Sequence, residues 1–289
     1  MPQNTLDKKN WMSHVLEIGC LKLTDLVWPG AHNCGMDRKP PDHDPVFGHW
    51  TVCQNGSFTW QLENGARAFD IRLGYDPAPA APAFYFHHNG YKSGRNLDDL
   101  VDAVTAFLDQ HPDEFLILDF HQLGDGDKPF GYRQLHERLM QGLGSRLISF
   151  EDAHLDVAHL KRASALRRIV AAVPARQELD DLYYWPKIPH KWTGEAFVYP
   201  SDLRNLIATS LAQPMQDILW SLSVTGYTFL GGPSHLERHI NDWFHSSRGL
   251  TTRCSIINSD FFEESDIVNH CWIASSEKAV YGERLRVTV

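Results

Sequence analysis

Apolar segments with strand character alternate with helical patterns along the whole chain, and this alternation restricts the possible folds more than any other feature. The clearest helix is expected over 96–112, where apolar residues recur on one face, Asn96 can cap the amino end and Pro112 lies at the carboxyl end. Because strands that alternate with helices of about ten residues or more are usually parallel and joined by crossovers, the pattern predicts an α/β fold. Strands are expected over 25–28, 66–73, 83–88, 114–120, 167–173, 195–200 and 253–262, and further helices over 57–65, 132–143, 202–213, 233–246 and 264–275.

One domain of this size with such an alternation predicts a distorted TIM-type (β/α) barrel over the 289 residues. A doubly wound sheet is the alternative, but the chain has neither the G-x-G-x-x-G nor the G-x-x-x-x-G-K-[ST] pattern of its nucleotide-binding versions. The hydrophobic share of 43% excludes a disordered chain. No apolar segment approaches the roughly 20 residues that cross a bilayer, so no transmembrane segment is expected.

The charge balance gives a formal net charge of −9, from 27 basic and 36 acidic residues. A chain this acidic is not expected to bind nucleic acid or to be attracted strongly to an anionic membrane surface. The first residues carry no apolar core of a secretory signal, and the five cysteines include no C-x-x-C pair. We therefore expect a soluble protein of the cytoplasm, or one exported without a conventional signal peptide, with peripheral membrane association. The sequence carries no signal for its oligomeric state.

Side chains that transfer protons or bind anions stand at the ends of five expected strands. They are His32 and Asn33, Asp70 and Arg72, His87 and His88, Asp119 and His121, and Asp260. In a parallel barrel the carboxyl ends of the strands meet at one face, which is where active sites lie. Residues two apart on a strand share a side, so Asp70 and Arg72 are expected to face the same way. By the same rule, only one of the adjacent His87 and His88 can face inward.

Two histidines on different strands with an arginine nearby form a set suited to cleaving a phosphodiester. One imidazole can take a proton from an attacking hydroxyl while the other protonates the leaving oxygen. The guanidinium of Arg72 matches the geometry of a phosphate and can balance the charge that develops on its oxygens. Asp70 is either part of this site or a buried partner of Arg72 that braces the barrel. Trp185, Trp192 and Tyr199 either line a substrate pocket or pack in the core.

Six blocks of the chain carry motif-like patterns: PGAHNCGM (29–36), QLENGARAFDIRL (61–73), FYFHHNGY (84–91), FLDQHPDEFLILDF (107–120), WPKIPHKW (185–192) and INSDFF (257–262). In this order they resemble the X domain of phosphatidylinositol-specific phospholipases C, in particular the bacterial and single-X-domain members. The first block resembles the signature PG[TS]H[DN][TS], and the second resembles Q-L-x-x-G-x-R-x-F-D-I-R. The resemblance is strongest over about 26–123. It implies one catalytic barrel domain over 1–289, with an amino-terminal half at about 20–150 and a carboxyl-terminal half at about 151–289.

The resemblance implies cleavage of phosphatidylinositol at a membrane surface to diacylglycerol and inositol 1,2-cyclic phosphate, without a cofactor. His32 is then the general base for the inositol 2-hydroxyl, and His88 is the general acid for the diacylglycerol oxygen. Arg72 holds the phosphate, and Asp260 orients His32 and fixes its tautomer. Asp70 supports this network. The remaining candidates for contact with the substrate are Asn33, His87, His121, Trp185 and Tyr199.

A calcium ion held by Asn33 and Asp70 is the alternative to this cofactor-free mechanism. Calcium-dependent members of the family have an asparagine after the first histidine, as this chain does. They also have an acidic residue where this chain has Ala68, and they lack an arginine at the position of Arg72. Calcium prefers several carboxylate oxygens, and a guanidinium beside Asp70 opposes its binding. We therefore expect a metal-independent mechanism.

Two other functions are compatible with the same barrel. One is a metal-dependent glycerophosphodiesterase or sphingomyelinase D-like enzyme, but such enzymes hold the metal with Glu and Asp pairs, and 68–70 contains no Glu-x-Asp. The other is a non-catalytic phosphoinositide-binding domain. Such a domain has no need of two histidines together with Arg72 and Asp260, so the sequence favours the phospholipase.

Overall fold

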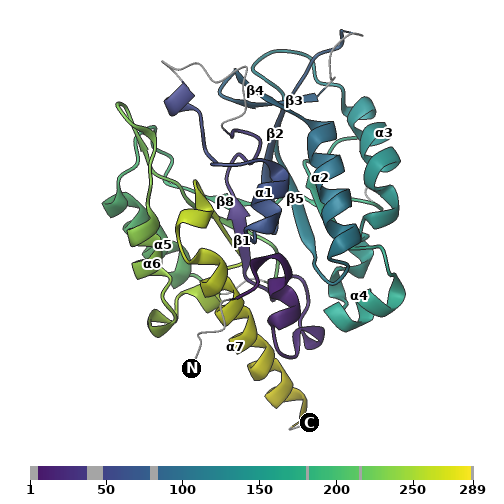
Figure 1. The fold of residues 1–289 in the computed structure, drawn as a ribbon, viewed down its shortest axis with the longest axis vertical. Helices are drawn as coiled ribbons and strands as arrows, with labels where there is room; N and C mark the ends of the chain where they lie inside the picture. Colours follow the sequence, from purple (N-terminus) through teal and green to yellow (C-terminus); the bar gives the residue numbers. More distant parts are fainter. Residues whose placement is uncertain (1–5, 38–47, 79–83, 180–181, 215–216, 288–289) are drawn as a thin grey trace.

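A computed structural model describes residues 6–37, 48–78, 84–179, 182–214 and 217–287, with side chains through Tyr281 (Figure 1). Its centre is a curled sheet of eight strands whose neighbours are all parallel. Within the described residues no pairing joins the first and last of these strands, so the sheet forms a (β/α) barrel that is open at one point. In spatial order the strands are β7 (Trp185–Pro186), β6 (Ile169–Val173), β5 (Leu116–Leu123), β2 (Ala68–Tyr75), β1 (Trp28–Ala31), β12 (Ile256–Ser259), β9 (Ser221–Val224) and β8 (His190–Lys191).

Helices in the connections flank the strands, and Figure 1 shows α2, α3 and α4 on one side and α5 and α6 on the other. The α-helices are α1 (Phe58–Glu63), α2 (Leu97–Gln110), α3 (Tyr132–Leu143), α4 (Val157–Ala163), α5 (Pro200–Ala212), α6 (Glu237–Trp243) and α7 (Ile267–Val287). Short 3₁₀ helices lie at Lys8–His14, Ile18–Cys20, Gly48–Trp50, Gly144–Arg146, Phe150–His154, Ser246–Arg248, Thr251–Arg253 and Phe262–Glu264. None of the helices in the described part of the chain combines the length and the apolar character that crossing a bilayer requires.

Two helix starts that the sequence predicts are confirmed by their capping hydrogen bonds. The Ser57 hydroxyl accepts the N–H of Trp60 at 3.3 Å, where α1 begins. At the start of α2, Asn96 and Asp99 each accept the other's backbone N–H at 3.0 Å. Each cap of this kind stabilises a helix by about 1 kcal/mol. These two helices lie in the connections that lead from β1 to β2 and from β2 to β5, so the caps help to fix the strands of the site.

The strand predicted over 195–200 is wrong. Val198 forms only an isolated bridge with Tyr227, and α5 begins at Pro200. Proline at the first position of a helix loses no hydrogen bond, because a backbone N–H at that position would have no acceptor within the helix. The apolar residues before Pro200 therefore lead into a helix.

A hairpin that the sequence does not predict carries the second histidine pair. The strands β3 (Phe84–His88) and β4 (Tyr91–Asn96) are antiparallel, and β3 pairs with β2. Asn89 and Gly90 have φ of 49° and 87°, the left-handed conformations that a two-residue hairpin turn requires. The turn follows His88 directly. A second small antiparallel pair is formed by β10 (Tyr227–Thr228) and β11 (Gly232–Pro233).

Strand β1 pairs with β12, the last strand in the chain, and this pairing brings His32 to the end of β12. The predicted strand at 25–28 is shifted, because β1 runs through the Pro-Gly pair to Ala31. A Cβ on Gly30 would lie 3.0 Å from Cγ2 of Ile256 and 3.1 Å from backbone atoms of Ile257 and Asn258, so a larger residue here would push β12 away by a few tenths of an ångström. His32 follows β1, and its N–H donates to the carbonyl of Ser259 at 3.1 Å.

A buried ion pair lies at the amino ends of β2 and β5, opposite the face that the sequence predicts to be functional. Arg67 Nε donates to Glu114 Oε2 at 2.8 Å, and both side chains are fully buried. Arg67 also donates to the carbonyl of Lys9, and Glu114 accepts the N–H of Met12. The pair thus ties the amino-terminal segment to the barrel. The five cysteines are free thiols.

Candidate active site

A cavity of about 630 Å³ lies at the carboxyl ends of the barrel strands. His32 follows β1, His88 ends β3 and Asp260 follows β12, and all three line this cavity. The polar part of its wall also includes Arg72, His121 and His190, and the apolar part includes Trp192, Phe197, Val198, Leu203, Tyr227 and Phe229. A polar end and an apolar wall suit a ligand that has a polar headgroup and an apolar remainder.

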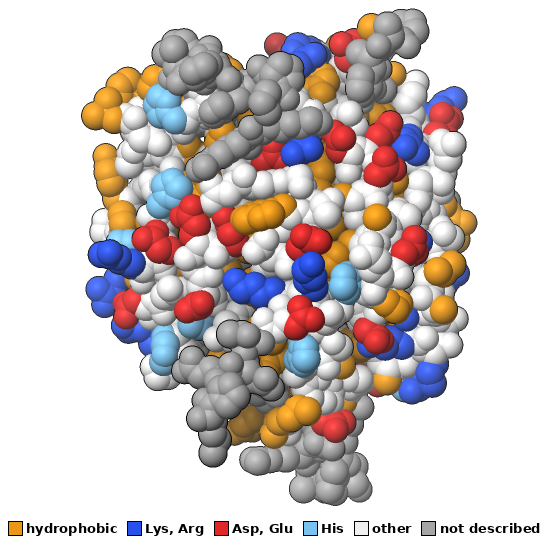
Figure 2. Space-filling view, viewed as in Figure 1, with side chains coloured by type: hydrophobic (Ala, Val, Ile, Leu, Met, Phe, Trp, Pro, Cys, Tyr) orange, Lys and Arg blue, Asp and Glu red, His pale blue; other side chains and the backbone are white. Residues whose placement is uncertain are grey.

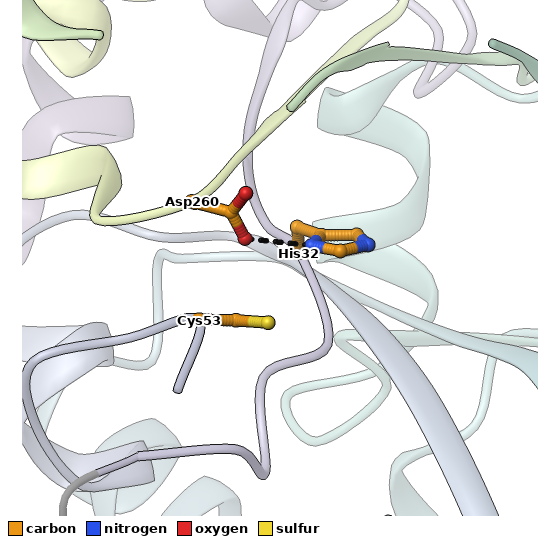
Figure 3. A group of neighbouring side chains, drawn as sticks. All are labelled: His32, Cys53 and Asp260. Carbon is orange, nitrogen blue, oxygen red and sulfur yellow. Dashed lines mark hydrogen bonds and ion pairs between the residues drawn. The ribbon is translucent and has the colours of Figure 1, made fainter. Parts of the chain in front are cut away.

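His32 is held by a carboxylate from the other end of the chain. Figure 3 shows its ring facing Asp260, with Nδ1 2.7 Å from Oδ1, and Cys53 beside the pair. A carboxylate can only accept, so Nδ1 carries the proton and Nε2 carries the lone pair. His32 is therefore set up as a base at Nε2. Burial raises the pKa of the Cys53 thiol well above its usual value, so this cysteine stays protonated.

Arg72 connects His32 to a second carboxylate. Its Nη2 lies 2.8 Å from Nε2 of His32. The same guanidinium donates from Nε to Asp70 Oδ1 at 3.2 Å and from Nη2 to Oδ2 at 2.9 Å, which is a two-pronged contact. Four side chains from β2 and from the segments after β1 and β12 thus form one chain of hydrogen bonds.

Asp70 is buried and does not line the cavity. It accepts the backbone N–H of Asn33 at 3.2 Å and the amide of Asn258 at 3.3 Å, in addition to Arg72. Burial would raise the pKa of Asp70, but the charge of Arg72, together with the nearby histidines His121, His32 and His190, outweighs burial and holds the pKa well below its usual range. In turn, burial would lower the pKa of Arg72, but Asp70 raises it. The ion pair is therefore permanent, and Asp70 acts through Arg72.

His88 presents a different electrostatic environment from His32. Its Nδ1 lies 3.2 Å from the carbonyl of Thr51, which can only accept, so Nδ1 carries a proton. Burial, with the nearby charges of His32 and Arg72, lowers the pKa of His88 to about 4. The ring is therefore neutral at pH 7 in the free protein. An anion bound beside it would raise this pKa and favour the protonated form.

The structure brings only part of the predicted set to the cavity. The predicted residues that line it are His32, Arg72, His88, His121, Trp192 and Asp260. Asn33 has φ of 42° and is fully buried, and the two polar atoms of its side chain find no partner among the described residues. His87 is also buried, with Nε2 3.1 Å from the carbonyl of Gly124, so His88 is the one of the pair that reaches the cavity.

Two aromatic candidates for substrate contact lie elsewhere. Trp185 is buried in the core, where its indole donates to the carbonyl of Ile148 at 2.9 Å. Tyr199 is exposed outside the cavity wall, at the start of α5. The structure thus assigns Trp185 to packing and Tyr199 to the helix terminus, because α5 replaces the strand predicted there.

Sequence reasoning misses two residues that the structure places at the site. Gln54 is buried, and its amide donates to the carbonyls of His32 at 2.8 Å and Ser259 at 3.1 Å, joining the ends of β1 and β12. His190 lies in the two-residue strand β8, and its Nε2 is 2.6 Å from Asp119 Oδ2. Gln54 has no local pattern that would reveal it, whereas His190 belongs to the WPKIPHKW block.

The residues proposed for calcium do not fit that ion. Both oxygens of Asp70 are engaged by Arg72, and the position two residues before Asp70 is an alanine. A cation at Asp70 would have to displace the guanidinium and would gain only one carboxylate. The side chain of Asn33 is buried away from the cavity lining. The guanidinium of Arg72 therefore occupies the place beside Asp70 where a calcium ion would have to bind.

Known proteins share both the sequence pattern and the fold. No protein-family model matches the chain. The chain is similar to PI-PLC X domain-containing protein 2 of Mus musculus, 27% identical over 294 residues, which is 89% of this chain and 84% of that protein. The protein of the same name in Homo sapiens is 31% identical over 200 residues, 62% of this chain and 64% of that protein.

Two further comparisons extend this similarity. The variant-surface-glycoprotein phospholipase C of Trypanosoma cruzi is 29% identical over 256 residues, 76% of this chain and 66% of that protein. The phosphatidylinositol-specific phospholipase C from Listeria monocytogenes superposes with a TM-score of 0.68 at 14% identity, over 93% of this chain and 98% of that one, which shows a common barrel. The ordered motifs and these relatives show that the chain is similar in sequence to PI-PLC X domain-containing proteins, and the superposition shows that it shares its barrel fold with a bacterial phosphatidylinositol-specific phospholipase C.

Proposed function

We propose that the chain is a phospholipase C that cleaves phosphatidylinositol to diacylglycerol and inositol 1,2-cyclic phosphate. The hydrogen-bond chain from Asp260 through His32 to Arg72 and Asp70 is the observation that carries this proposal. It places a base, an orienting carboxylate and a phosphate-matching cation next to one another. The relative from Trypanosoma cruzi is named a phospholipase C.

The attack on phosphorus begins at His32. Nε2 takes the proton of the inositol 2-hydroxyl, and the hydroxyl oxygen forms a bond to phosphorus that closes the five-membered ring. Asp260 stabilises the resulting imidazolium and keeps the ring in its tautomer. Arg72 leaves Nε2 for the phosphate oxygens, where its charge matches the charge that develops. Asp70 keeps the guanidinium in reach.

His88 completes the reaction on the leaving group. Its protonated Nε2 gives a proton to the glycerol oxygen as the bond from phosphorus to that oxygen breaks. The proton gained by His32 and the proton lost by His88 balance, and exchange with water restores both rings. Since the free His88 has a pKa of about 4, the anionic phosphodiester must raise this value for the acid form to be populated at pH 7.

The aromatic wall of the cavity continues to the surface and forms a rim suited to a lipid bilayer. Phe229 and Leu230 are 70% and 82% exposed, and Trp192 and Phe197 are exposed beside the cavity. Figure 2 shows apolar side chains at the upper left edge of the molecule, where a loop above α5 lies in Figure 1, and mixed charges over the rest of this face. Insertion of aromatic side chains does not depend on a basic surface, which agrees with the net charge of −9.

Phosphorus NMR of phosphatidylinositol vesicles incubated with the chain in EDTA tests the proposal. The expected result is the resonance of a five-membered cyclic inositol phosphate, absent with His32→Ala. Product that forms only after calcium is added would show a metal-dependent reaction. No product in either condition would favour a non-catalytic phosphoinositide-binding domain.

A further inference from the structure

A second cluster of polar side chains lies in the cavity, apart from the chain of hydrogen bonds around His32. It consists of Asp119 and His121 on β5 and His190 on β8. One ligand atom from each of the three lies within 4.8 Å of the other two. The strands β5 and β8 are not neighbours in the sheet, so the barrel itself brings these residues together.

Hydrogen bonds among the described residues leave some polar atoms of this cluster without a partner. His190 Nε2 lies 2.6 Å from Asp119 Oδ2, and the rings of His190 and His121 stack with centroids 3.8 Å apart. Asp119 is 3% exposed, yet its Oδ1 has no hydrogen-bond partner among the described residues, and neither does Nδ1 of His121. Buried polar atoms of this kind are satisfied in native proteins by ordered water or by an ion, and here two of them belong to side chains that share one cluster with His190.

We propose that Asp119, His121 and His190 bind a divalent transition-metal ion, with Zn²⁺ as the best match. Two imidazole nitrogens and one carboxylate oxygen form a donor set for Zn²⁺, Fe²⁺, Co²⁺ or Mn²⁺, whereas Ca²⁺ and Mg²⁺ prefer oxygen alone. The ligand atoms around a tetrahedral zinc lie about 3.4 Å apart, and the rings of His121 and His190, which stack at 20° to each other, would have to turn apart so that both lone pairs point at one ion. The metal takes the place of the proton between His190 and Asp119.

The surroundings leave this ion accessible. His121 and His190 line the cavity, and three protein ligands leave at least one coordination position for a hydroxyl or phosphate oxygen. The nearby cation Arg72 is paired with Asp70, which limits its repulsion of the metal. The site lies outside the set that moves protons in the proposed reaction, so the metal is not needed for the reaction, and the inference does not rest on the proposed function.

Cobalt spectroscopy on the full chain tests this site without any lipid. After removal of metals with EDTA and exchange into chelator-free buffer, Co²⁺ is expected to bind one per chain with visible d–d bands, and Zn²⁺ is expected to displace it. We expect His121→Ala and His190→Ala each to weaken Co²⁺ binding at least about 100-fold. Asp119→Asn provides a third variant that keeps the side-chain shape. Thermal unfolding without metal confirms that each variant is folded.

The matched control is His154→Ala, because His154 is exposed and is not one of the residues that line the cavity. It should bind Co²⁺ as the unmodified chain does. Absence of binding at one ion per chain would overturn the proposal. So would binding that survives His190→Ala and is lost in His32→Ala, because the metal would then belong to the group of His32, Cys53 and Asp260. Since binding is the readout, failure of phospholipase activity would not affect this result.

Discussion

The guanidinium Nη2 of Arg72 lies 2.8 Å from Nε2 of His32, the nitrogen that a general base would use. Since His32 Nδ1 donates to Asp260, Nε2 holds the lone pair and accepts from Arg72. The same Nη2 donates to Asp70 at 2.9 Å. The proposed base is therefore covered by a cation that a phosphate can attract away. In the proposed mechanism, binding of the substrate anion would draw Arg72 away and so free Nε2 of His32 to act as the base.

Arg72→Lys is expected to lower kcat/KM for phosphatidylinositol by about 10²- to 10³-fold. A lysine keeps the charge, but an ammonium cannot make the two-pronged contact with Asp70 and reach His32 as well. Steady-state kinetics on mixed micelles measure the effect, with Arg72→Met as the variant that lacks the charge. Activity within about tenfold of the unmodified chain in Arg72→Lys would show that the charge alone matters.

Asp260→Asn is expected to reduce kcat by about 10²- to 10⁴-fold and to change KM little. An asparagine keeps the shape, but its amide can donate to Nδ1 of His32, which favours the tautomer with the proton on Nε2. Asp242→Asn is the control, because Asp242 pairs with Arg248 at the surface. A large rise in KM with unchanged kcat would instead assign Asp260 to substrate binding.

Because His88 is buried, we expect the free energy of unfolding to fall in acid. Its pKa of about 4 lies below the ordinary 6.5, so between these values the unfolded chain binds a proton that the folded chain does not bind. Stability therefore falls as the pH falls through this window, by about 2 kcal/mol between pH 7 and pH 4.5 for this group. Burial lowers the pKa of His121 to about 3, which adds a loss in the same direction.

Urea unfolding at pH 7 and pH 4.5 measures this effect. His88→Gln removes the titrating group, so the difference in unfolding free energy between the two pH values should shrink by about 2 kcal/mol. His154→Gln, at an exposed position, should leave the difference unchanged. An equal pH dependence for the His88 variant and the unmodified chain would mean that His88 titrates normally.

The sequence predicts that the polar candidates meet at one face of the sheet, because each of them follows an apolar strand. His32, His88 and Asp260 come directly at strand ends, and parallel strands bring their carboxyl ends together. Arg72 is predicted to face the same side as Asp70 because the two residues are two positions apart on one strand. The structure places the side chains of His32, His88, Arg72 and Asp260 in the wall of one cavity, and Asp70 lies behind Arg72.

The second half of the barrel is harder to predict for physical reasons. The strands β7 and β8 have two residues each, too few for a pattern of alternation, and their position depends on pairing with β6 and β9. His190 therefore meets Asp119 only because the sheet curls and brings β8 near β5. At 195–200 the apolar residues resemble a strand, but Pro200 starts a helix, and this local choice moves Tyr199 away from the cavity.

The ion pair of Arg67 and Glu114 is expected to be structural. Removing one partner leaves a buried charge without compensation, so Arg67→Met should lower the unfolding free energy by about 3–5 kcal/mol. The double variant Arg67→Met with Glu114→Leu should recover much of this loss, because no charge then stays buried. Urea unfolding of the two variants measures the difference. Equal stability of the single and double variants would show that Glu114 does not need its partner.

The exposed rim should govern binding to membranes more than it governs chemistry. Phe229→Ala is expected to weaken binding to phosphatidylinositol-containing vesicles about tenfold, because an aromatic ring of this exposure contributes about 1.5–3 kcal/mol when it is buried in an apolar environment. Vesicle sedimentation measures the binding, and hydrolysis of a short-chain monomeric substrate measures the chemistry. The matched control is Leu166→Ala, since Leu166 is also exposed but precedes β6 at the opposite end of the barrel. Equal losses in both variants would assign vesicle binding to general hydrophobicity, and a loss on the monomeric substrate alone would show that Phe229 contributes to substrate binding within the cavity and not to membrane binding.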